Sequence, residues 1–199
     1  HPRTFKVKEV LSQGLLGDIR FLRGSFTYFL SRPEDYRWIP EYGGGGLWDV
    51  GCYPLSYAMM VMGTTPKTAF GWQKTGSTGI DEYFAGQLTF ENDVVAQIDC
   101  GTNAAVHTHF EIRGSLGTLW IAHPYNTRNN AVPILLRQGD QETAFTFEDF
   151  NGYKAQTENM ADVVIGNARP NITLQESAEI NRTLLTLFES ARLGKPLSL

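Results

Sequence analysis

Apolar residues recur at helical spacing in four segments of the chain. In the first segment Pro2 is well placed to open a helix, because the first N–H groups of a helix have no partner within it. In the second segment Gly63 and Pro66 follow the last apolar position and end the helix. The predicted helices cover residues 2–13, 46–62, 153–167 and 174–194.

Strands are predicted where apolar and polar residues alternate. Residues 18–30 show this period at Ile19 and Phe21 and again from Phe26 to Leu30, so we expect one long strand there. From about residue 66 to 147 strand follows strand, separated by turn signals rich in Gly, Asn and Asp. The clearest strands of this region are 82–90, 94–101, 106–114 and 117–122.

The alternation gives the strands one apolar and one polar face. The apolar face holds Phe84, Leu88, Phe90, Val94, Ala96, Ile98, Val106, Phe110 and Ile112. The polar face holds Tyr83, Gln87, Thr89, Gln97, Asp99, His107, His109, Glu111 and Arg113. We therefore predict an α+β fold, an open and mostly antiparallel β-sheet with helices on one face and the other face free for oligomerisation. The predicted homo-oligomer contacts are Tyr83, Gln87, Gln97, His107, His109 and Arg113, and a solvated face is the alternative.

Length and composition narrow the class of protein. The 199 residues, 42% of them hydrophobic, are enough for a single domain covering residues 1–199. A formal charge of −4 argues against a nucleic-acid partner, and no apolar run is long enough for a membrane span. Two cysteines, Cys52 and Cys100, favour a reducing, cytoplasmic compartment. His107 and His109 share a strand face with only Glu111 nearby, so we predict no metal site.

Residues 43–57, GGGGLWDVGCYPLSY, join a glycine run to an apolar helix that carries candidate chemistry. Asp49 and Tyr53 lie four residues apart and therefore share a helix face, and Pro54 predicts a kink. A carboxylate among apolar neighbours is costly unless it is paired. A tyrosine, with an ordinary pKa of about 10, can pass a proton if its neighbours lower that value. A structural hydrogen bond of Asp49 and a merely flexible glycine loop are the alternatives.

The same segment resembles part of a known oxidoreductase family. EYGGGGLWDVGCYPLSYAMMVMG is similar to the stretch of the glucose–fructose oxidoreductase / inositol dehydrogenase / rhizopine catabolism oxidoreductase (Gfo/Idh/MocA) family in which a Gly-Gly-Gly run leads to an Asp-x-Gly-x-His/Tyr-Pro-like helix. HPRTFKVKEVLSQGLLGDIRFLRGSF resembles the helix and strand that open the family's C-terminal domain, and EIRGSLGTLWI resembles an internal strand pair. Residues 158–199 resemble its closing helices, so the resemblance covers essentially the whole chain.

The resemblance implies an NAD(P)-dependent oxidoreductase that transfers hydride between nicotinamide and a sugar, cyclitol or related alcohol or carbonyl substrate. NAD or NADP would be bound mainly by an N-terminal Rossmann domain, which is absent from this chain, so the chain alone is expected to be inactive. Asp49 matches the family's helix aspartate near the nicotinamide. Tyr53 stands where many members have the catalytic His, as in the dihydrodiol- and xylose-dehydrogenase-like branches. The implied roles are proton exchange for Tyr53 and orientation for Asp49, with assistance from the lysine of a Glu-Lys-Pro motif that the resemblance places upstream of this chain.

The resemblance also implies binding residues around this pair. The candidate substrate-binding residues are Arg37, Trp38 and Tyr153, and the candidate cofactor-binding residues are His1, Gly45 and Gly46. Arg37 could bond a hydroxyl or carboxylate and Trp38 could cover an apolar ring face, although a surface arginine beside a packing tryptophan is the plainer interpretation. A hypothesis from another class is a non-catalytic binding or dimerisation module that retains the fold without the cofactor domain.

Overall fold

The computed structural model describes residues 1–125 and 132–199. Its α-helices are α1 Pro2–Ser12, α2 Cys52–Met62, α3 Gly152–Val164 and α4 Leu174–Leu193. Its strands are β1 Ile19–Phe29, β2 Thr68–Thr75, β3 Asp81–Thr89, β4 Val95–Gly101, β5 Asn103–Gly114, β6 Thr118–Ala122, β7 Ile134–Gln138, β8 Gln141–Phe145 and β9 Leu197–Ser198. The four predicted helices and the predicted long first strand are thus found, with shifts of a few residues at their ends.

All the strands of the described residues form one open sheet, in the order β8-β7-β6-β5-β1-β4-β3-β2-β9. The central pair, β1 and β4, is parallel, and the other described pairs are antiparallel. In the register of the centre, Gly24 of β1 lies between Ile98 of β4 and Phe110 of β5. The predicted α+β fold with an open, mostly antiparallel sheet is confirmed.

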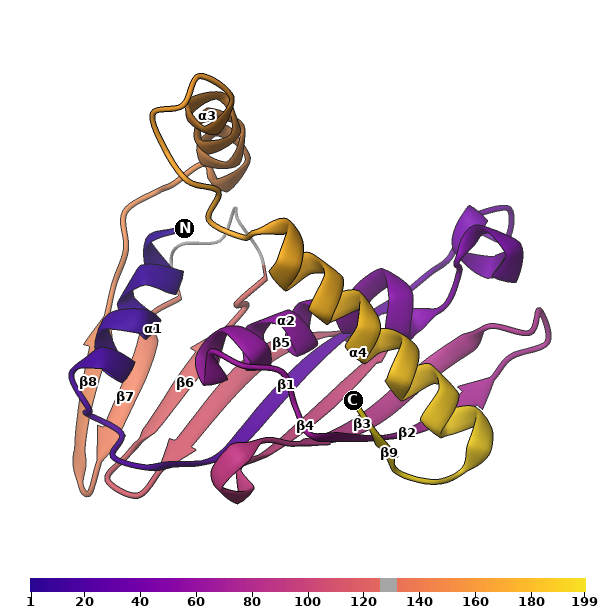
Figure 1. Cartoon of the computed structure of the whole chain (residues 1–199), viewed down its shortest axis with the longest axis horizontal. Coiled ribbons are helices and arrows are strands. Elements are labelled where there is room, and N and C mark those ends of the chain that lie inside the picture. The colour runs from indigo at the N-terminus through magenta and orange to yellow at the C-terminus, as the bar shows by residue number, and fades with distance from the viewer. Residues whose placement is uncertain (126–131) are drawn as a thin grey trace.

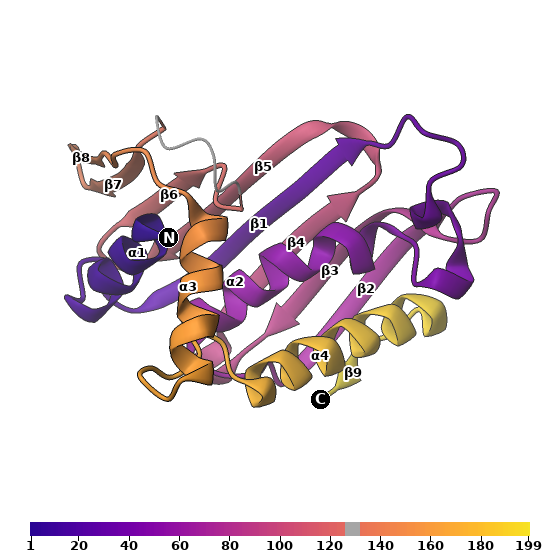
Figure 2. The same ribbon diagram turned by 90° about the horizontal axis from the view of Figure 1, so that it is seen from above.

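The helices lie on one face of the sheet (Figures 1 and 2). Helix α2 runs over the centre of the sheet, α4 runs beside it over β2, and α1 lies near the β6–β7 end. Helix α3 stands away from the strands and buries no side chain fully. Helix α4 begins with a capping box formed by Thr173 and Glu176 and ends at Gly194, as helix-end chemistry favours. No helix of the described residues is both long and apolar enough to cross a membrane.

The core lies between the helices and the predicted apolar face. The residues predicted to be inside that are less than 5% exposed are Phe84, Leu88, Phe90, Val94, Ala96, Ile98, Phe110 and Ile112. Val106 is the exception. This residue is 75% exposed, so the prediction that it lies in the core was wrong. The pairing of β5 with β6 begins only at His109, and the β1–β5 register shifts between Thr27 and Phe29. Val106 therefore lies at the rim of the sheet, where alternation no longer decides burial.

The chain enters α2 through three short turns. Residues Tyr36–Trp38 and Pro40–Tyr42 form single 3₁₀ turns, and Leu47–Gly51 forms a π-helical turn that continues into α2. The irregularity expected from Pro54 thus takes the form of a wide turn just before the proline. Such wide turns are frequent at functional sites, and this one carries Asp49.

Candidate active site

The turn that carries Asp49 is fixed on both of its sides. The backbone N–H of Asp49 donates to the carbonyl of Gly45 at 3.1 Å. One turn further on, Pro54 packs against β1 at Gly24, where a Cβ would lie only 2.7 Å from the proline Cβ. Glycine at position 24 therefore lets α2 approach the strand closely. This approach places the Asp49 carboxylate beside the end of β1.

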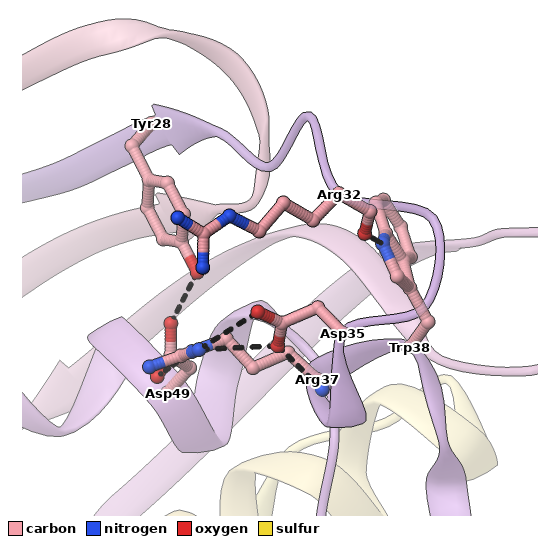
Figure 3. A network of polar contacts seen from close by, with 6 residues as sticks. All are labelled: Tyr28, Arg32, Asp35, Arg37, Trp38 and Asp49. Atoms are coloured by element: carbon pink, nitrogen blue, oxygen red, sulfur yellow. Dashed lines mark hydrogen bonds and ion pairs between the residues drawn. The ribbon is translucent and has the colours of Figure 1, made fainter.

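The Asp49 carboxylate binds one group with each of its oxygens (Figure 3). The hydroxyl of Tyr28, near the end of β1, donates to Oδ2 at 2.5 Å. The Nε–H of Arg37, from the loop before α2, donates to Oδ1 at 2.8 Å. The cost of placing this carboxylate among apolar neighbours is thus offset by an ion pair and a phenolic hydrogen bond. The sequence reasoning expected a partner for Asp49, and the structure shows that there are two.

Arg37 is itself held from two further directions. Its Nη1 lies 3.1 Å from Oδ1 of Asp35, and its guanidinium lies 4.6 Å from the centre of the Tyr36 ring. Its backbone N–H also donates to Asp35 at 3.0 Å, which lowers the pKa of that carboxyl. The hydrogen bond to Asp49 raises the pKa of Arg37 above its ordinary value. The guanidinium therefore stays charged and is presented in one orientation, with its side chain 30% exposed.

Tyr28 is a functional candidate that the sequence analysis did not identify. It was expected only as one of the alternating residues of the first strand, on the same face as Phe26. Burial, followed by its hydrogen bond to Asp49, raises the pKa of the phenol well above its ordinary value. Tyr28 therefore keeps its proton and is a hydrogen-bond donor to the carboxylate throughout the physiological range. The usable sequence signal was a tyrosine at an inward position close to the end of a strand.

Tyr53 lies on the same helix as Asp49 but in different surroundings. Its ring packs on Phe26 at 5.2 Å and on Tyr125 at 5.7 Å between centroids, and 43% of the residue is exposed. Among the described residues no hydrogen bond joins it to Asp49. Burial raises the pKa of the Tyr53 phenol, and the charge of Asp49 acts in the same direction. A phenol that is protonated and accessible can donate a proton to a bound substrate.

The other predicted binding residues lie on three further segments of the chain. Trp38 donates its indole N–H to the carbonyl of Arg32 at 2.8 Å, which fixes the ring beside the polar network (Figure 3). Tyr153 is 60% exposed near the start of α3. His1 caps α1 by accepting from the N–H of Arg3 at 3.2 Å. The substrate role of Trp38 and Tyr153 and the cofactor role of His1 stay predictions.

Gly45 and Gly46 have a close neighbour that explains their lack of a side chain. Both are buried, and a Cβ at Gly45 would lie 2.0 Å from Oδ1 of Asp81. A Cβ at Gly46 would lie 2.8 Å from the Cα of Gly101. The space beside these two glycines is therefore filled by β3 and β4 of this chain. The cofactor role of Gly45 and Gly46 stays a prediction.

The fold and the site together describe an α+β domain that supports a carboxylate, a guanidinium and two phenols at one end of a helix. The model of the GFO/IDH/MocA C-terminal domain matches residues 5–120. The chain therefore belongs to the GFO/IDH/MocA family, as the resemblance of its motifs implied.

Individual relatives agree with this family and cover the whole chain. D-xylose 1-dehydrogenase (NADP(+)) 2 of Haloferax volcanii is 25% identical over 201 residues, which cover 100% of this chain and 62% of the relative. The dTDP-3,4-didehydro-2,6-dideoxy-alpha-D-glucose 3-reductase of Actinomadura kijaniata is 26% identical over 197 residues, 98% of this chain and 58% of the relative. This chain thus spans about three fifths of the length of these curated relatives.

A solved structure shows the same fold. The aldose-aldose oxidoreductase from Caulobacter crescentus superposes on this chain with a TM-score of 0.90, covering 99% of this chain and 60% of the other. The two sequences are 17% identical over the superposed region. At this identity the likeness establishes the arrangement of helices and strands and leaves the chemistry to the side chains described above.

Proposed function

We propose that this chain supplies the substrate-binding part of an NAD(P)-dependent oxidoreductase that acts on a sugar or a related alcohol or carbonyl compound. The observation that carries the proposal is the Tyr28–Asp49–Arg37 network at the start of α2, with the accessible Tyr53 one turn further on. The relatives named above, a xylose dehydrogenase and a sugar 3-ketoreductase, support this class of reaction.

Tyr53 is the proton donor and acceptor in this proposal. In the reducing direction its hydroxyl donates a proton to the oxygen of the substrate carbonyl, and in the oxidising direction the phenolate takes the hydroxyl proton back. Its raised pKa suits the reducing direction. The oxidising direction requires a positive charge near the phenol, which the lysine implied by the family resemblance would supply. Asp49 and Arg37 fix the wall of the site beside Tyr53 and offer polar groups to substrate hydroxyls.

The cofactor supplies the hydride and is assigned chiefly to the part of the relatives that this chain does not cover. We infer that His1 also contacts the cofactor in the full-length protein. It lies with its ring 5.0 Å from that of Phe150, just before α3.

The test is turnover of the full-length protein with Tyr53→Phe. We expect kcat to fall on the order of 100-fold or more, because a positioned acid–base group contributes that much to a proton-transfer step. D-xylose and other aldoses are assayed with NAD and with NADP, and the reduced nicotinamide is followed by its absorbance. Tyr57→Phe is the matched control, since it removes a buried hydroxyl one turn along the same helix. Equal and small effects of the two substitutions would contradict the role of Tyr53.

We also infer that the polar face of the sheet, opposite the helices and called the far face below, pairs with a second copy of the chain. The predicted contact residues on this face are extended by Phe21, Phe70 and Trp72, which are 49%, 39% and 56% exposed. Trp72 packs on Tyr83 at 6.2 Å, which gives the surface a broad aromatic area. A large exposed aromatic area on a sheet favours association.

The oligomer is tested with Trp72→Arg, which places a charge in the aromatic area. We expect sedimentation velocity to show a smaller species than for the unchanged protein. Tyr42→Arg is the control, because Tyr42 is 70% exposed but lies in the loop before α2. Identical sedimentation of the Trp72→Arg variant and the unchanged protein would contradict this interface.

A further inference from the structure

Asp81 is a buried acid that none of the expectations above included. It begins β3 and is 2% exposed. Its Oδ2 accepts a hydrogen bond from the backbone N–H of Leu47 at 2.6 Å, and the N–H of Gly46 also contributes to holding its charge. Within the described residues no salt bridge neutralises it. The carboxylate therefore depends on the first amides of the turn that carries Asp49.

The glycine run is shaped to receive this carboxylate. Gly45 has φ +118°, a conformation that side chains rarely adopt, and its missing Cβ leaves the space that Oδ1 of Asp81 fills. Gly46 lies against Gly101 of β4 in the same way. The two glycines and the acid thus form one close-packed joint between the sheet and the start of the helix.

The same joint connects the two partners of the ion pair. The N–H of Gly45 donates to the carbonyl of Arg37 at 3.1 Å, and the carbonyl of Gly45 accepts from the N–H of Asp49 at 3.1 Å. The backbones of Arg37 and Asp49 are therefore both bound to Gly45. Asp81 accepts from the amide of Leu47, two residues further on. A movement of this joint changes the separation of the guanidinium from the Asp49 carboxylate.

We propose that Asp81 is a positioning residue, which acts through the Gly45–Gly46–Leu47 backbone to hold Asp49 in register with Arg37. A negative charge is suited to this place because it faces the positive end of a helix and its unpaired N–H groups. The effect of Asp81 on turnover rests on the function proposed above for Asp49 and Tyr53. The effect of Asp81 on the backbone of the joint is independent of that proposed function.

Burying the charged carboxylate of Asp81 costs free energy, and this distinguishes its contact with the turn from an ordinary stabilising contact. Burial raises the pKa of Asp81 to about 6, although the amide hydrogen bonds act in the opposite direction. On β4, Cys100 is a buried thiol whose pKa is raised by burial and also by the charge of Asp81. The protein thus keeps a charge at neutral pH that desolvation disfavours. An uncharged residue would suit stability better.

The experiment compares Asp81→Ala with Asp81→Asn in the full-length protein. Alanine removes every acceptor, whereas asparagine keeps one side-chain oxygen for the Leu47 amide. We expect amide hydrogen exchange in peptides spanning residues 44–52 to become about tenfold faster in Asp81→Ala and to be largely restored in Asp81→Asn. We expect kcat to fall about 10- to 100-fold in Asp81→Ala, with recovery in Asp81→Asn and little change in the KM for the cofactor.

The control is Asp99→Ala, which removes an exposed acid from the opposite face of the neighbouring strand β4. It should leave both exchange over residues 44–52 and kcat unchanged. Unchanged exchange in Asp81→Ala, or a loss in kcat that Asp81→Asn does not restore at all, would overturn the role of Asp81. Faster exchange with normal kcat would support Asp81 as the residue that holds the joint, and would instead contradict the function proposed for Asp49.

Discussion

The two faces of the sheet use similar residue types in opposite ways. On the helix-covered face Asp49 is bound by Tyr28 and Arg37, which come from two other segments, and the accessible Tyr53 stands next to them. On the far face the rings contact one another, with His109 stacked on Trp120 at 4.8 Å and His107 within 2.9 Å of His109. The first arrangement fixes charged groups at one place, and the second spreads aromatic area over a surface.

This difference is the reason for proposing the reacting site on the helix-covered face. A reacting site needs charged groups in one defined geometry, and the Asp35–Arg37–Asp49 chain supplies it. An interface needs area and complementary rings, as the far face offers. Burial lowers the pKa of His109, so this imidazole stays uncharged near neutral pH. His109 of the far face therefore suits contact better than acid–base work.

The comparison predicts its largest effect for the acid of the helix-covered face. Asp49→Asn in the full-length protein removes the charge that orients Arg37 and weakens the acceptor for Tyr28. We expect kcat to fall on the order of 100-fold, measured with the best aldose substrate. Asp99→Asn provides the matched change on the far face, where Asp99 accepts from the Ser25 hydroxyl at 2.5 Å. Comparable losses in the two variants would remove the distinction between the faces.

The second effect concerns the glycine joint beneath the site. Gly45→Ala forces a side chain to φ +118° and into the Asp81 carboxylate, so we expect the free energy of unfolding to fall by about 3 kcal/mol. Gly43→Ala meets nothing within 4 Å and has φ +71°, so only about 1 kcal/mol of strain is expected. Denaturant titration gives both values. Equal values for the two alanines would contradict the close packing of the joint.

The third effect is the loss of turnover when the hydroxyl of Tyr28 is removed. Tyr28→Phe keeps the ring and removes the hydroxyl that donates to Asp49. We expect turnover to fall about tenfold, because a hydrogen bond to a charged group is worth about 1.5 kcal/mol. Tyr36→Phe is the control, since the contact of Tyr36 with Arg37 is made by the face of its ring. If Tyr28→Phe and Tyr36→Phe have the same turnover, the hydroxyl of Tyr28 plays no part.

The smallest effect is a dependence of stability on pH. The pKa of Asp81 is about 6 in the folded protein against an ordinary 3.8, so the native state holds a proton that the unfolded chain has lost between these values. Its contribution to the unfolding free energy therefore decreases as pH rises from about 4 to about 6 and is constant above. Asp81→Asn removes this slope, so the variant should gain on the order of 1 kcal/mol over the parent between pH 4.5 and 6.5. Parallel pH profiles of the two proteins would contradict the raised pKa.

The sequence predicts the fold and part of the site because those features are local. Alternation of period two identified the core positions of β3 and β4. It was wrong at Val106, because β5 pairs with β6 only from His109 onward and the absence of this partner strand leaves Val106 exposed. Helical spacing placed Asp49 and Tyr53 on one helix. Tyr28 and Asp81 could not be recognised, because strands far away in the sequence bring them to the turn. Their roles follow from tertiary contacts that no local pattern contains.

The most direct measurement is a crystal structure of the full-length protein with NADP and its best sugar substrate. We expect the reacting oxygen of the sugar to lie within hydrogen-bond reach of the Tyr53 hydroxyl, with the Asp49–Arg37 pair intact beside it. A sugar bound on the far face of the sheet, or separated from Tyr53 by packed side chains, would contradict the account.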